Sequence, residues 1–472
     1  MNKIRVSRRG RKQKVRVGSP DASLTGSAGA EAVRELERAL GITAALDKEI
    51  GPVKQRDRGL PGGQLLVSLA SCMLAGGDHL VSLDRRRADI AGQMLEPAPA
   101  PASTTAAGLA RRFGAAQLAG IGAGVAAVNA RVLGLTGQVR RSALLRSVTI
   151  DLDATDVEVR GRGKAGCAYN YQGQRCYRPH IAFWAELGVP VAADLLAGDE
   201  DPRASAHLLA RRALAALPAG PAEIRLRADA GYFAGELARE ALRRSIKFAI
   251  GAKRNSAVRR AAAAIGEDAW VPAIGMDNAE VAACPCIPDW WPADTTCLVR
   301  RVRIPAGAVS CDPRARRRRT IPKDQLALAL AGLADHVYGY SFILTNLDVS
   351  DGEKIAEAEH WYRHRTDIEA LNRDAKLGAA LRHMPSGDQR VNLVWMHAAL
   401  LAAAISAWLQ ELTRIDRGNG RGRRMITRLR HELIAIPARV TRHGRQITLR
   451  LPPGQDLLPA VLNRLQALPS PG

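Results

Sequence analysis

Val148-Thr-Ile-Asp-Leu-Asp-Ala-Thr155 is the stretch that decides the fold of this chain. Its apolar residues alternate with Thr149, Asp151 and Asp153, which is the pattern of a strand with both carboxylates on one face. Two acids on one face of a strand repel each other and lower its propensity to form. A bound divalent cation would remove this conflict, so the stretch predicts a strand that carries a cation site.

A second acidic residue ends a similar pattern further along the chain. Glu223-Ile-Arg-Leu-Arg-Ala-Asp-Ala-Gly-Tyr232 predicts a strand that gives way to a glycine turn at Asp229. A helix over 235–244 and a strand over 246–250 would complete a β-α-β unit, in an α/β fold. Ligands collect beyond the carboxyl ends of the strands in such sheets, so Asp153 and Asp229 are predicted to share one rim.

A third acidic residue lies in Tyr362-Arg-His-Arg-Thr-Asp-Ile-Glu-Ala-Leu-Asn-Arg-Asp-Ala-Lys376. At about 100° per residue, Tyr362, Arg365, Glu369 and Lys376 would fall on one narrow face of a single helix. A dry core holds such charges only if they are paired or bound to metal. This face is therefore expected at a site that contains both a metal and an anion.

Charge indicates the class of partner. The 472 residues carry a formal net charge of +23, which predicts an anionic polymer as partner. A membrane surface is the weaker alternative, because we find no signal peptide and the longest apolar run, 394–409, predicts a buried helix. The seven cysteines are sparse, as suits a reducing cytoplasm, and Cys284-Pro-Cys286 lacks the paired knuckles of a zinc site.

The ends of the chain are predicted to be helical and basic. Residues 1–28 form a basic arm that could lie along phosphates or act only as a solubilising tail. Residues 29–140 form a helical N-terminal DNA-binding region, in which a helix with a Ser/Thr N-cap over 101–113 is either a recognition helix or a plain bundle helix. Residues 401–472 form a C-terminal region for DNA binding or dimerisation, since 414–450 hold eleven Arg and two acids.

The middle of the chain is predicted to be one core with an insertion. Helix and strand periodicity weakens over 252–334, which is too long for a loop, so a separate β-rich insertion is expected there. It would divide a core made of 141–251 and 335–400. Ser350-Asp-Gly-Glu353 is a capping box that would open the helix bearing Glu369.

These motifs resemble a known family. The spacing Tyr-x2-Arg-x3-Glu-x6-Lys is similar to the signature of the DDE-type insertion-sequence transposases. Together with Asp151-Leu-Asp-Ala-Thr155 and Arg227-Ala-Asp-Ala-Gly-Tyr232, it resembles the group designated insertion sequence thirteen-eighty. The resemblance runs from about residue 65 to 450. It implies a ribonuclease-H-like catalytic core interrupted by a β-rich insertion, with helical N-terminal and C-terminal regions.

The resemblance also implies roles for individual residues. Asp153, Asp229 and Glu369 would be catalytic ligands of Mg²⁺, for which Mn²⁺ could substitute, and carboxylates are the hard ligands that such ions take. Tyr362, Arg365 and Lys376 would bind phosphates at the DNA end. Trp290 or Trp291 would stack on a displaced base, or else be core aromatics.

Two positions leave alternatives open. Asp151 remains an alternative to Asp153 as the first ligand, although the Asp-x-Thr spacing favours Asp153. Ala154 stands where the family usually has Ser or Thr, which removes a polar group beside the first carboxylate.

The function expected from these residues and the resemblance is that of a DNA transposase. It would bind the terminal inverted repeats of a bacterial-type mobile element, cleave the ends by two-metal hydrolysis and transfer the strands into target DNA. A homodimer on double-stranded DNA, a hairpin at the DNA end and a cytoplasmic, nucleoid-associated location without membrane contact are the accompanying expectations. The alternatives are a non-catalytic DNA-binding protein derived from a transposase and a ribonuclease-H-like nuclease without strand transfer.

Overall fold

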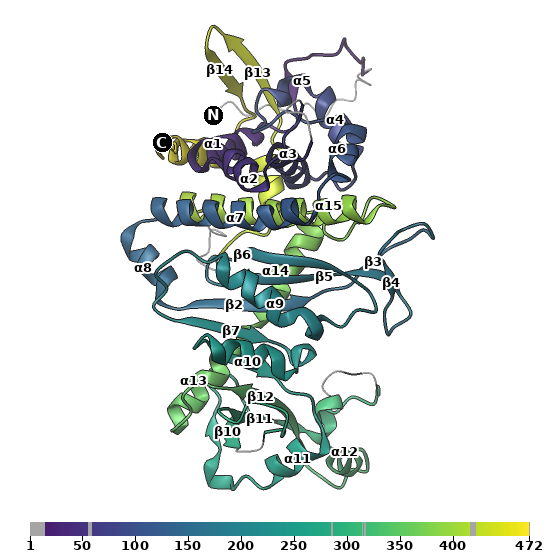
Figure 1. The fold of residues 1–472 in the computed structure, drawn as a ribbon, viewed down its shortest axis with the longest axis vertical. Helices are drawn as coiled ribbons and strands as arrows, with labels where there is room; N and C mark the ends of the chain where they lie inside the picture. Colours follow the sequence, from purple (N-terminus) through teal and green to yellow (C-terminus); the bar gives the residue numbers. More distant parts are fainter. Residues whose placement is uncertain are drawn as a thin grey trace, which may run out of the picture.

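The computed structural model of the chain describes residues 15–471 apart from 55–58, 285–286, 314, 316–317 and 416–421. The first fourteen residues of the predicted basic arm and part of Cys284-Pro-Cys286 therefore lie outside the described residues. Figure 1 shows tiers along the long axis: a helical body at the top, the central strands below it, and a lower lobe around β10–β12.

The helical body is built from both ends of the chain (Figure 1). Its N-terminal helices are α1 (Ala30–Leu40), α2 (Ile42–Ile50), α3 (Gly62–Leu74), α4 (Ser82–Ala88), α5 (Ile90–Gln93), α6 (Ser103–Ala110), α7 (Ala115–Leu135) and α8 (Gln138–Arg146). Its C-terminal elements are α15 (Gln389–Thr413), α16 (Ile426–Leu429), a π-helix (Arg430–Ile434), β13 (Ala438–His443), β14 (Gln446–Arg450) and α17 (Leu457–Gln466). Helix α17 packs on α1, and β1 (Leu24–Thr25) pairs with β13. The predicted N- and C-terminal regions thus pack together.

Helix α15 is the central core helix, as the apolar run 394–409 predicts. It contacts α3 on one side and β6 on the other, and most of its apolar length is buried. By length and composition α7 and α15 could each cross a membrane, but a buried core helix meets the same criterion. Burial against the sheet and the helical body explains the apolar composition of α15 without a bilayer.

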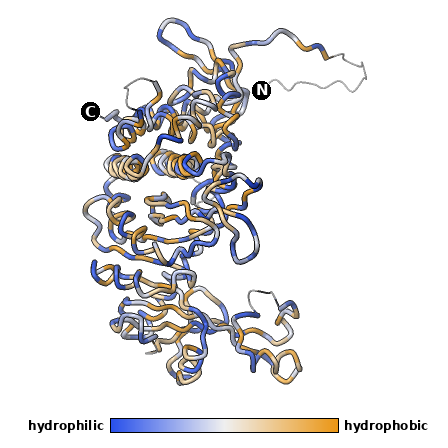
Figure 2. Tube along the Cα trace, turned by 45° about the vertical axis from the view of Figure 1, so that its right-hand side comes forward, coloured by the Kyte–Doolittle hydropathy of each residue, from blue (hydrophilic) through white to orange (hydrophobic). Residues whose placement is uncertain are grey.

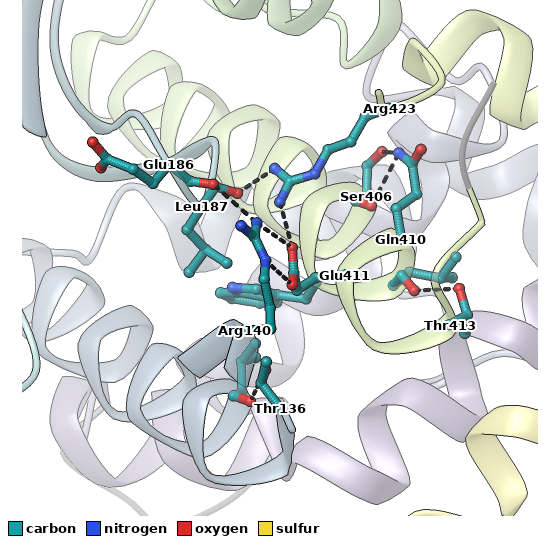
Figure 3. Close-up of polar contacts among 12 residues, drawn as sticks. Thr136, Arg140, Glu186, Leu187, Ser406, Gln410, Glu411, Thr413 and Arg423 are labelled. Atoms are coloured by element: carbon teal, nitrogen blue, oxygen red, sulfur yellow. Dashed lines mark hydrogen bonds and ion pairs between the residues drawn. The ribbon is translucent and has the colours of Figure 1, made fainter. Parts of the chain in front are cut away.

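A polar network fastens the end of α15 to α8 and to the turn between β5 and β6 (Figure 3). The Glu411 carboxylate accepts from Arg140 Nε at 2.8 Å and from Arg423 Nη2 at 3.1 Å. Arg423 also donates to the carbonyl of Leu187, and Arg140 Nη2 to that of Glu186 at 3.4 Å. Because Glu411 is almost buried, the two guanidinium groups supply the charge partners that its burial requires.

Helix α6 begins differently from the prediction. Ala102 occupies the N-cap position with no side-chain cap, so the predicted Ser/Thr N-cap is wrong. Ser103 is the first residue of the helix, and its N–H and hydroxyl both donate to Asp84, at 3.0 and 2.5 Å. A carboxylate from α4 thus takes the place of the local cap, which residues 101–113 alone could not reveal.

Apart from the small sheet β1-β13-β14, the described strands form one eleven-stranded mixed sheet. Its strands are β2 (Val148–Ala154), β3 (Val157–Glu158), β4 (Ala168–Tyr169), β5 (Arg175–Trp184), β6 (Val189–Ala197), β7 (Ile224–Ala228), β8 (Lys247–Gly251), β9 (Val271–Pro272), β10 (Ala279–Cys284), β11 (Thr296–Pro305) and β12 (His336–Thr345). The order is β3-β5-β2-β7-β8-β12-β11-β10-β9, with β4 and β6 also paired to β5. Strands β2, β7 and β8 are parallel, whereas β5 and β12 run antiparallel to them. The protein is thus an α/β fold, with α9 (Pro202–Ala215) and α10 (Gly235–Arg243) joining the central strands.

The segment 252–334 adds strands to this same sheet. It contains α11 (Ser256–Ala263), α12 (Lys323–Leu330) and strands β9, β10 and β11. Strand β11 pairs along its whole length with β12, and the end of β12, Ile343–Thr345, pairs with β8. The segment is therefore joined to the central strands through β12 and does not form a detached sheet. Figure 2 shows hydrophobic residues recurring along the chain in this lower lobe.

The predicted single helix over the Tyr362–Lys376 stretch is two helices. Helix α13 (Gly352–Arg363) ends before His364, and α14 (Thr366–Gly378) begins after Arg365. At the break the Arg365 N–H bonds to the carbonyl three residues back, and the Thr366 hydroxyl occupies the Arg363 carbonyl. The helical ladder is interrupted because its acceptors are used by a tighter turn and by a side chain.

The start of α13 also differs in detail from the prediction. Its cap is Asp351, whose Oδ1 accepts from the Lys354 N–H at 2.9 Å, and not Ser350. The predicted capping box is therefore wrong, because Asp351 caps the helix alone and Lys354 stands at the third helical position, where a capping box needs Glu or Gln.

Candidate functional site

Two carboxylates lie together at the ends of neighbouring parallel strands. Leu152 of β2 is paired with Ala228 of β7, so Asp153 and Asp229 follow at the same level of the sheet. Burial, and after it the nearby charge of Asp229, raises the pKa of Asp153 to about 6. Asp229 Oδ1 accepts from the Gly231 N–H at 2.8 Å, in the turn that follows β7. The two acids therefore share the rim that the strand pattern predicts.

Asp151 lies on the same strand but has a different environment. It is fully buried, and its two oxygens accept from Arg227 Nε and Nη2 at 2.7 and 2.8 Å. Arg227 also donates to the Trp361 carbonyl at 2.6 Å and stacks over the Trp361 ring at 5.2 Å. This bidentate pair joins β2, β7 and α13, and it engages both oxygens of Asp151.

Tyr362 and Arg365 reach the rim from the break between α13 and α14. The Tyr362 hydroxyl donates to the Ala228 carbonyl at 3.4 Å. Gly251 ends β8 beside it, where a Cβ would lie 2.7 Å from the Tyr362 hydroxyl, so only glycine leaves room for the ring. The buried Arg365 faces both Asp153 and Asp229, and its charge partly offsets the rise in the pKa of Asp153. One cation is thus fixed against two anions.

Glu369 stands apart from the two aspartates. Its side chain is 53% exposed, and its nearest ion partner is Arg365 at 3.9 Å. Among the described residues, no three His, Cys, Asp or Glu side chains gather closely enough to hold a metal ion. The structure therefore brings Asp153 and Asp229 together but leaves Glu369 at the surface of α14.

Two further residues of α14 contact the end of β2. Asn372 Nδ2 donates to Asp153 Oδ2 at 2.5 Å, and Lys376 Nζ donates to the Asp156 carbonyl at 2.8 Å. The sequence analysis missed Asn372. Its position three residues after Glu369 and four before Lys376 places it on the same helical face, and that spacing was the available signal.

The two adjacent tryptophans have different surroundings. Trp291 is 4% exposed and packs against Phe233 and Phe248 at centroid distances of 5.3 and 6.5 Å, so it is a core residue. Trp290 is 51% exposed and lies 4.9 Å from Phe233, which follows Asp229 by four residues. Of the two, only Trp290 presents an exposed ring.

The chemistry of the rim fits a divalent cation. Two hard oxygen ligands at adjacent strand ends repel each other, and a cation between them would relieve this repulsion. Asp153 and Asp229 could hold such an ion together, with the buried amide of Asn372 beside them. The donor set suits Mg²⁺ or Mn²⁺ better than zinc, because sulfur and imidazole ligands play no part in it.

Residues 7–470 match the family model described as transposase DDE domain group 1. The chain belongs to this family of DDE transposases. Among curated proteins, none matches the sequence of this transposase. A similar solved structure is the cryo-EM structure of the piggyBac transposase synaptic complex with hairpin DNA. It is 10% identical with a TM-score of 0.41, and the match covers 85% of this chain and 78% of that one.

Proposed function

We propose that this transposase binds the terminal inverted repeats of its mobile element, cleaves the DNA ends by two-metal hydrolysis and transfers the strands into target DNA. The observation that carries the proposal is the pair Asp153 and Asp229, at the ends of parallel β2 and β7, with Arg365 buried against both. The order β6-β5-β2-β7-β8, with only β5 antiparallel to β2, supports a ribonuclease-H-like core. The three sequence motifs support a place in the thirteen-eighty group.

We assign Asp153, Asp229 and Glu369 as ligands of Mg²⁺, for which Mn²⁺ can substitute. Such cations, when bound, activate the attacking oxygen and stabilise the leaving oxygen of a phosphodiester. Glu369 lies one turn before Asn372, which already contacts Asp153. We therefore expect the exposed Glu369 side chain to turn toward the rim when cation and DNA are present.

The cations around the rim suit the DNA end. Arg365 is held by burial with its guanidinium facing the acids, where a phosphate would add a further anionic partner. Tyr362 can donate its hydroxyl to the same phosphate, and Lys376 can exchange the Asp156 carbonyl for a phosphate oxygen. We expect the exposed ring of Trp290 to stack on a base displaced from the duplex.

The helical body offers a second contact surface for DNA. The hairpin β13–β14 carries four exposed arginines, and Figure 2 shows many hydrophilic residues along it. These are Arg439, Arg442, Arg445 and Arg450. They fit the phosphate backbone of an inverted repeat, whose contacts would be salt-dependent. A homodimer on the DNA and a cytoplasmic, nucleoid-associated location remain part of the proposal.

A second candidate function is a non-catalytic DNA-binding protein derived from a transposase. The separation of Glu369 from the two aspartates favours it, as does Ala154 beside the first of them. In that case the net charge and the exposed arginines would still support binding, and cleavage would be absent.

Metal-dependent cleavage separates the two candidates. The full chain is incubated with linear DNA that carries its gene and natural flanks, with Mg²⁺ or with EDTA, and breaks are mapped to the nucleotide. We expect breaks at inverted-repeat ends only with Mg²⁺, and joined products if strand transfer follows. Glu369→Gln should abolish the breaks and retain end binding, whereas Asp367→Asn, which removes an exposed charge from the same helix, should keep both. Tight binding without breaks in the wild type would establish the second candidate instead.

A further inference from the structure

Among the described residues of α14, Asn372 is the one whose side chain hydrogen-bonds to the acidic rim, the pair of carboxylates formed by Asp153 and Asp229. Its Nδ2 lies 2.5 Å from Asp153 Oδ2, across 219 residues of sequence. The side chain is 5% exposed, so water does not compete freely for this bond. A short bond to a charged acceptor in a buried place is stronger than a neutral one and fixes the orientation of the acceptor.

The other polar atom of Asn372 is unexplained by the protein alone. Asn372 Oδ1 is buried and has no hydrogen-bond partner among the described residues. Leaving a buried carbonyl unpaired is unfavourable, and such atoms commonly mark a water or an ion. Since Nδ2 is committed to Asp153, the amide cannot be turned over to satisfy Oδ1 without losing that bond.

A second bond fixes the register of α14 against β2. Lys376 lies four residues after Asn372 and bonds the Asp156 carbonyl, three residues after Asp153. Two successive turns of one helical face are thus tied to Asp153, near the end of β2, and to Asp156, just beyond it. Glu369 occupies the preceding turn of the same face.

We propose that Asn372 is a positioning residue of the divalent-cation site: it holds the Asp153 carboxylate and aligns α14 so that Glu369 can join Asp153 and Asp229. Its unpaired Oδ1 would supply a neutral oxygen beside the cation, able to accept a hydrogen bond from water. The inference rests on the proposed function, because it assumes a cation at the acidic rim. An amide in this position orients one carboxylate without adding a further negative charge to the rim.

The test measures Mn²⁺ binding directly, through the electron paramagnetic resonance signal of free Mn²⁺ titrated with the full chain. Partners that orient metal ligands typically contribute 10- to 100-fold to metal affinity. We therefore expect Asn372→Ala to weaken Mn²⁺ binding by about 10-fold or more. Asp367→Asn is the matched control, since it lies on the exposed face of α14, and it should bind Mn²⁺ as the wild type does.

A second variant keeps the test decisive if the alanine variant folds poorly. Asn372→Asp has the same shape but cannot donate to an ionised Asp153. Its metal-free melting temperature should fall, and Mn²⁺ should raise that temperature by more than it does for Asn372→Ala, because a third carboxylate restores a hard ligand. Such a recovery would show that position 372 lies within reach of the cation, and its absence would place this side chain outside the cation site.

The outcomes separate this inference from the proposed function. If the wild type binds Mn²⁺, Asp153→Asn loses it and both Asn372 variants bind as the wild type does, the positioning role is overturned and the cation site stands. If the wild type binds no Mn²⁺ at millimolar concentration, the cation site and the inference both fail. Weakened binding in Asn372→Ala with recovery in Asn372→Asp supports the inference.

Discussion

Asp151 and Asp153 lie two residues apart on one strand face, yet the structure predicts opposite consequences for Asp151→Asn and Asp153→Asn. In Asp151→Asn the guanidinium of Arg227, which is buried with it, keeps its charge but loses its anionic partner. Breaking a buried ion pair by removing one partner costs about 3–5 kcal/mol. The variant should unfold at a clearly lower urea concentration than the wild type.

Asp153→Asn should behave in the opposite way. Burial and the charge of Asp229 raise the pKa of Asp153 to about 6, so the ionised carboxylate is disfavoured in the folded protein. The raised pKa corresponds to a cost of up to about 3 kcal/mol at neutral pH, which a neutral amide removes. Stability of the wild type should fall as the pH rises from about 4 through 6, and this dependence should be weaker in Asp153→Asn.

The assay combines urea unfolding, followed by circular dichroism at pH 7.5 and pH 4.5, with cleavage of the inverted-repeat ends. Asp151→Asn should lower the unfolding midpoint, and Asp151→Leu combined with Arg227→Met should recover most of the loss. Asp153→Asn should keep or raise the midpoint and abolish cleavage. A stable but inactive Asp151→Asn, beside an active Asp153→Asn, would refute the assignment of both residues.

Three other predictions follow from the same structure. Trp291→Ala should cost about 3–5 kcal/mol of unfolding free energy because the ring is buried. Trp290→Ala should leave the unfolding free energy nearly unchanged and reduce the fluorescence response of a 2-aminopurine placed at the DNA end. Equal losses of stability in the two variants would contradict this prediction. His397 lines an apolar cavity of about 280 Å³, and its burial lowers its pKa to about 4. The neutral imidazole therefore stabilises the fold above pH 6.5, and this contribution is lost as the pH falls toward 4. His397→Leu should therefore lose less melting temperature between pH 7 and pH 5 than the wild type does, and an identical loss would exclude His397 as a source of acid sensitivity. Lys376→Ala should lower the salt dependence of end binding by about one released counterion if Lys376 exchanges the Asp156 carbonyl for a phosphate; an unchanged slope in a filter-binding series would show that it stays bound to the protein.

The strands and helices that the sequence predicted correctly depend on the pattern of apolar and polar residues within each segment. Alternation of apolar and polar residues gives β2 and β7, and the Ala-Gly turn after Asp229 ends the second of them. These are properties of a chain segment and its immediate neighbours, so a single sequence contains them. The same holds for the apolar run that becomes the buried helix α15 and for the excess of Lys and Arg.

Residues with similar local sequence differ in their roles because distant segments of the chain contact them differently. Asp151 and Asp153 share a strand face, but only the arrival of Arg227 on β7 and Asn372 on α14 makes one an ion-pair partner and the other a rim carboxylate. Trp290 and Trp291 are neighbours in sequence, but only Trp291 is buried, where its ring packs against Phe248.

The sequence by itself determined the α/β class, the strands that end at Asp153 and Asp229, and the preference for an anionic partner. The tertiary structure decided that α13 and α14 are separate, that Glu369 stands at the surface, and that Asn372 belongs to the site. The physical reason is that strand and turn preferences act within a few residues, whereas burial and pairing of polar groups depend on which segments the fold brings together.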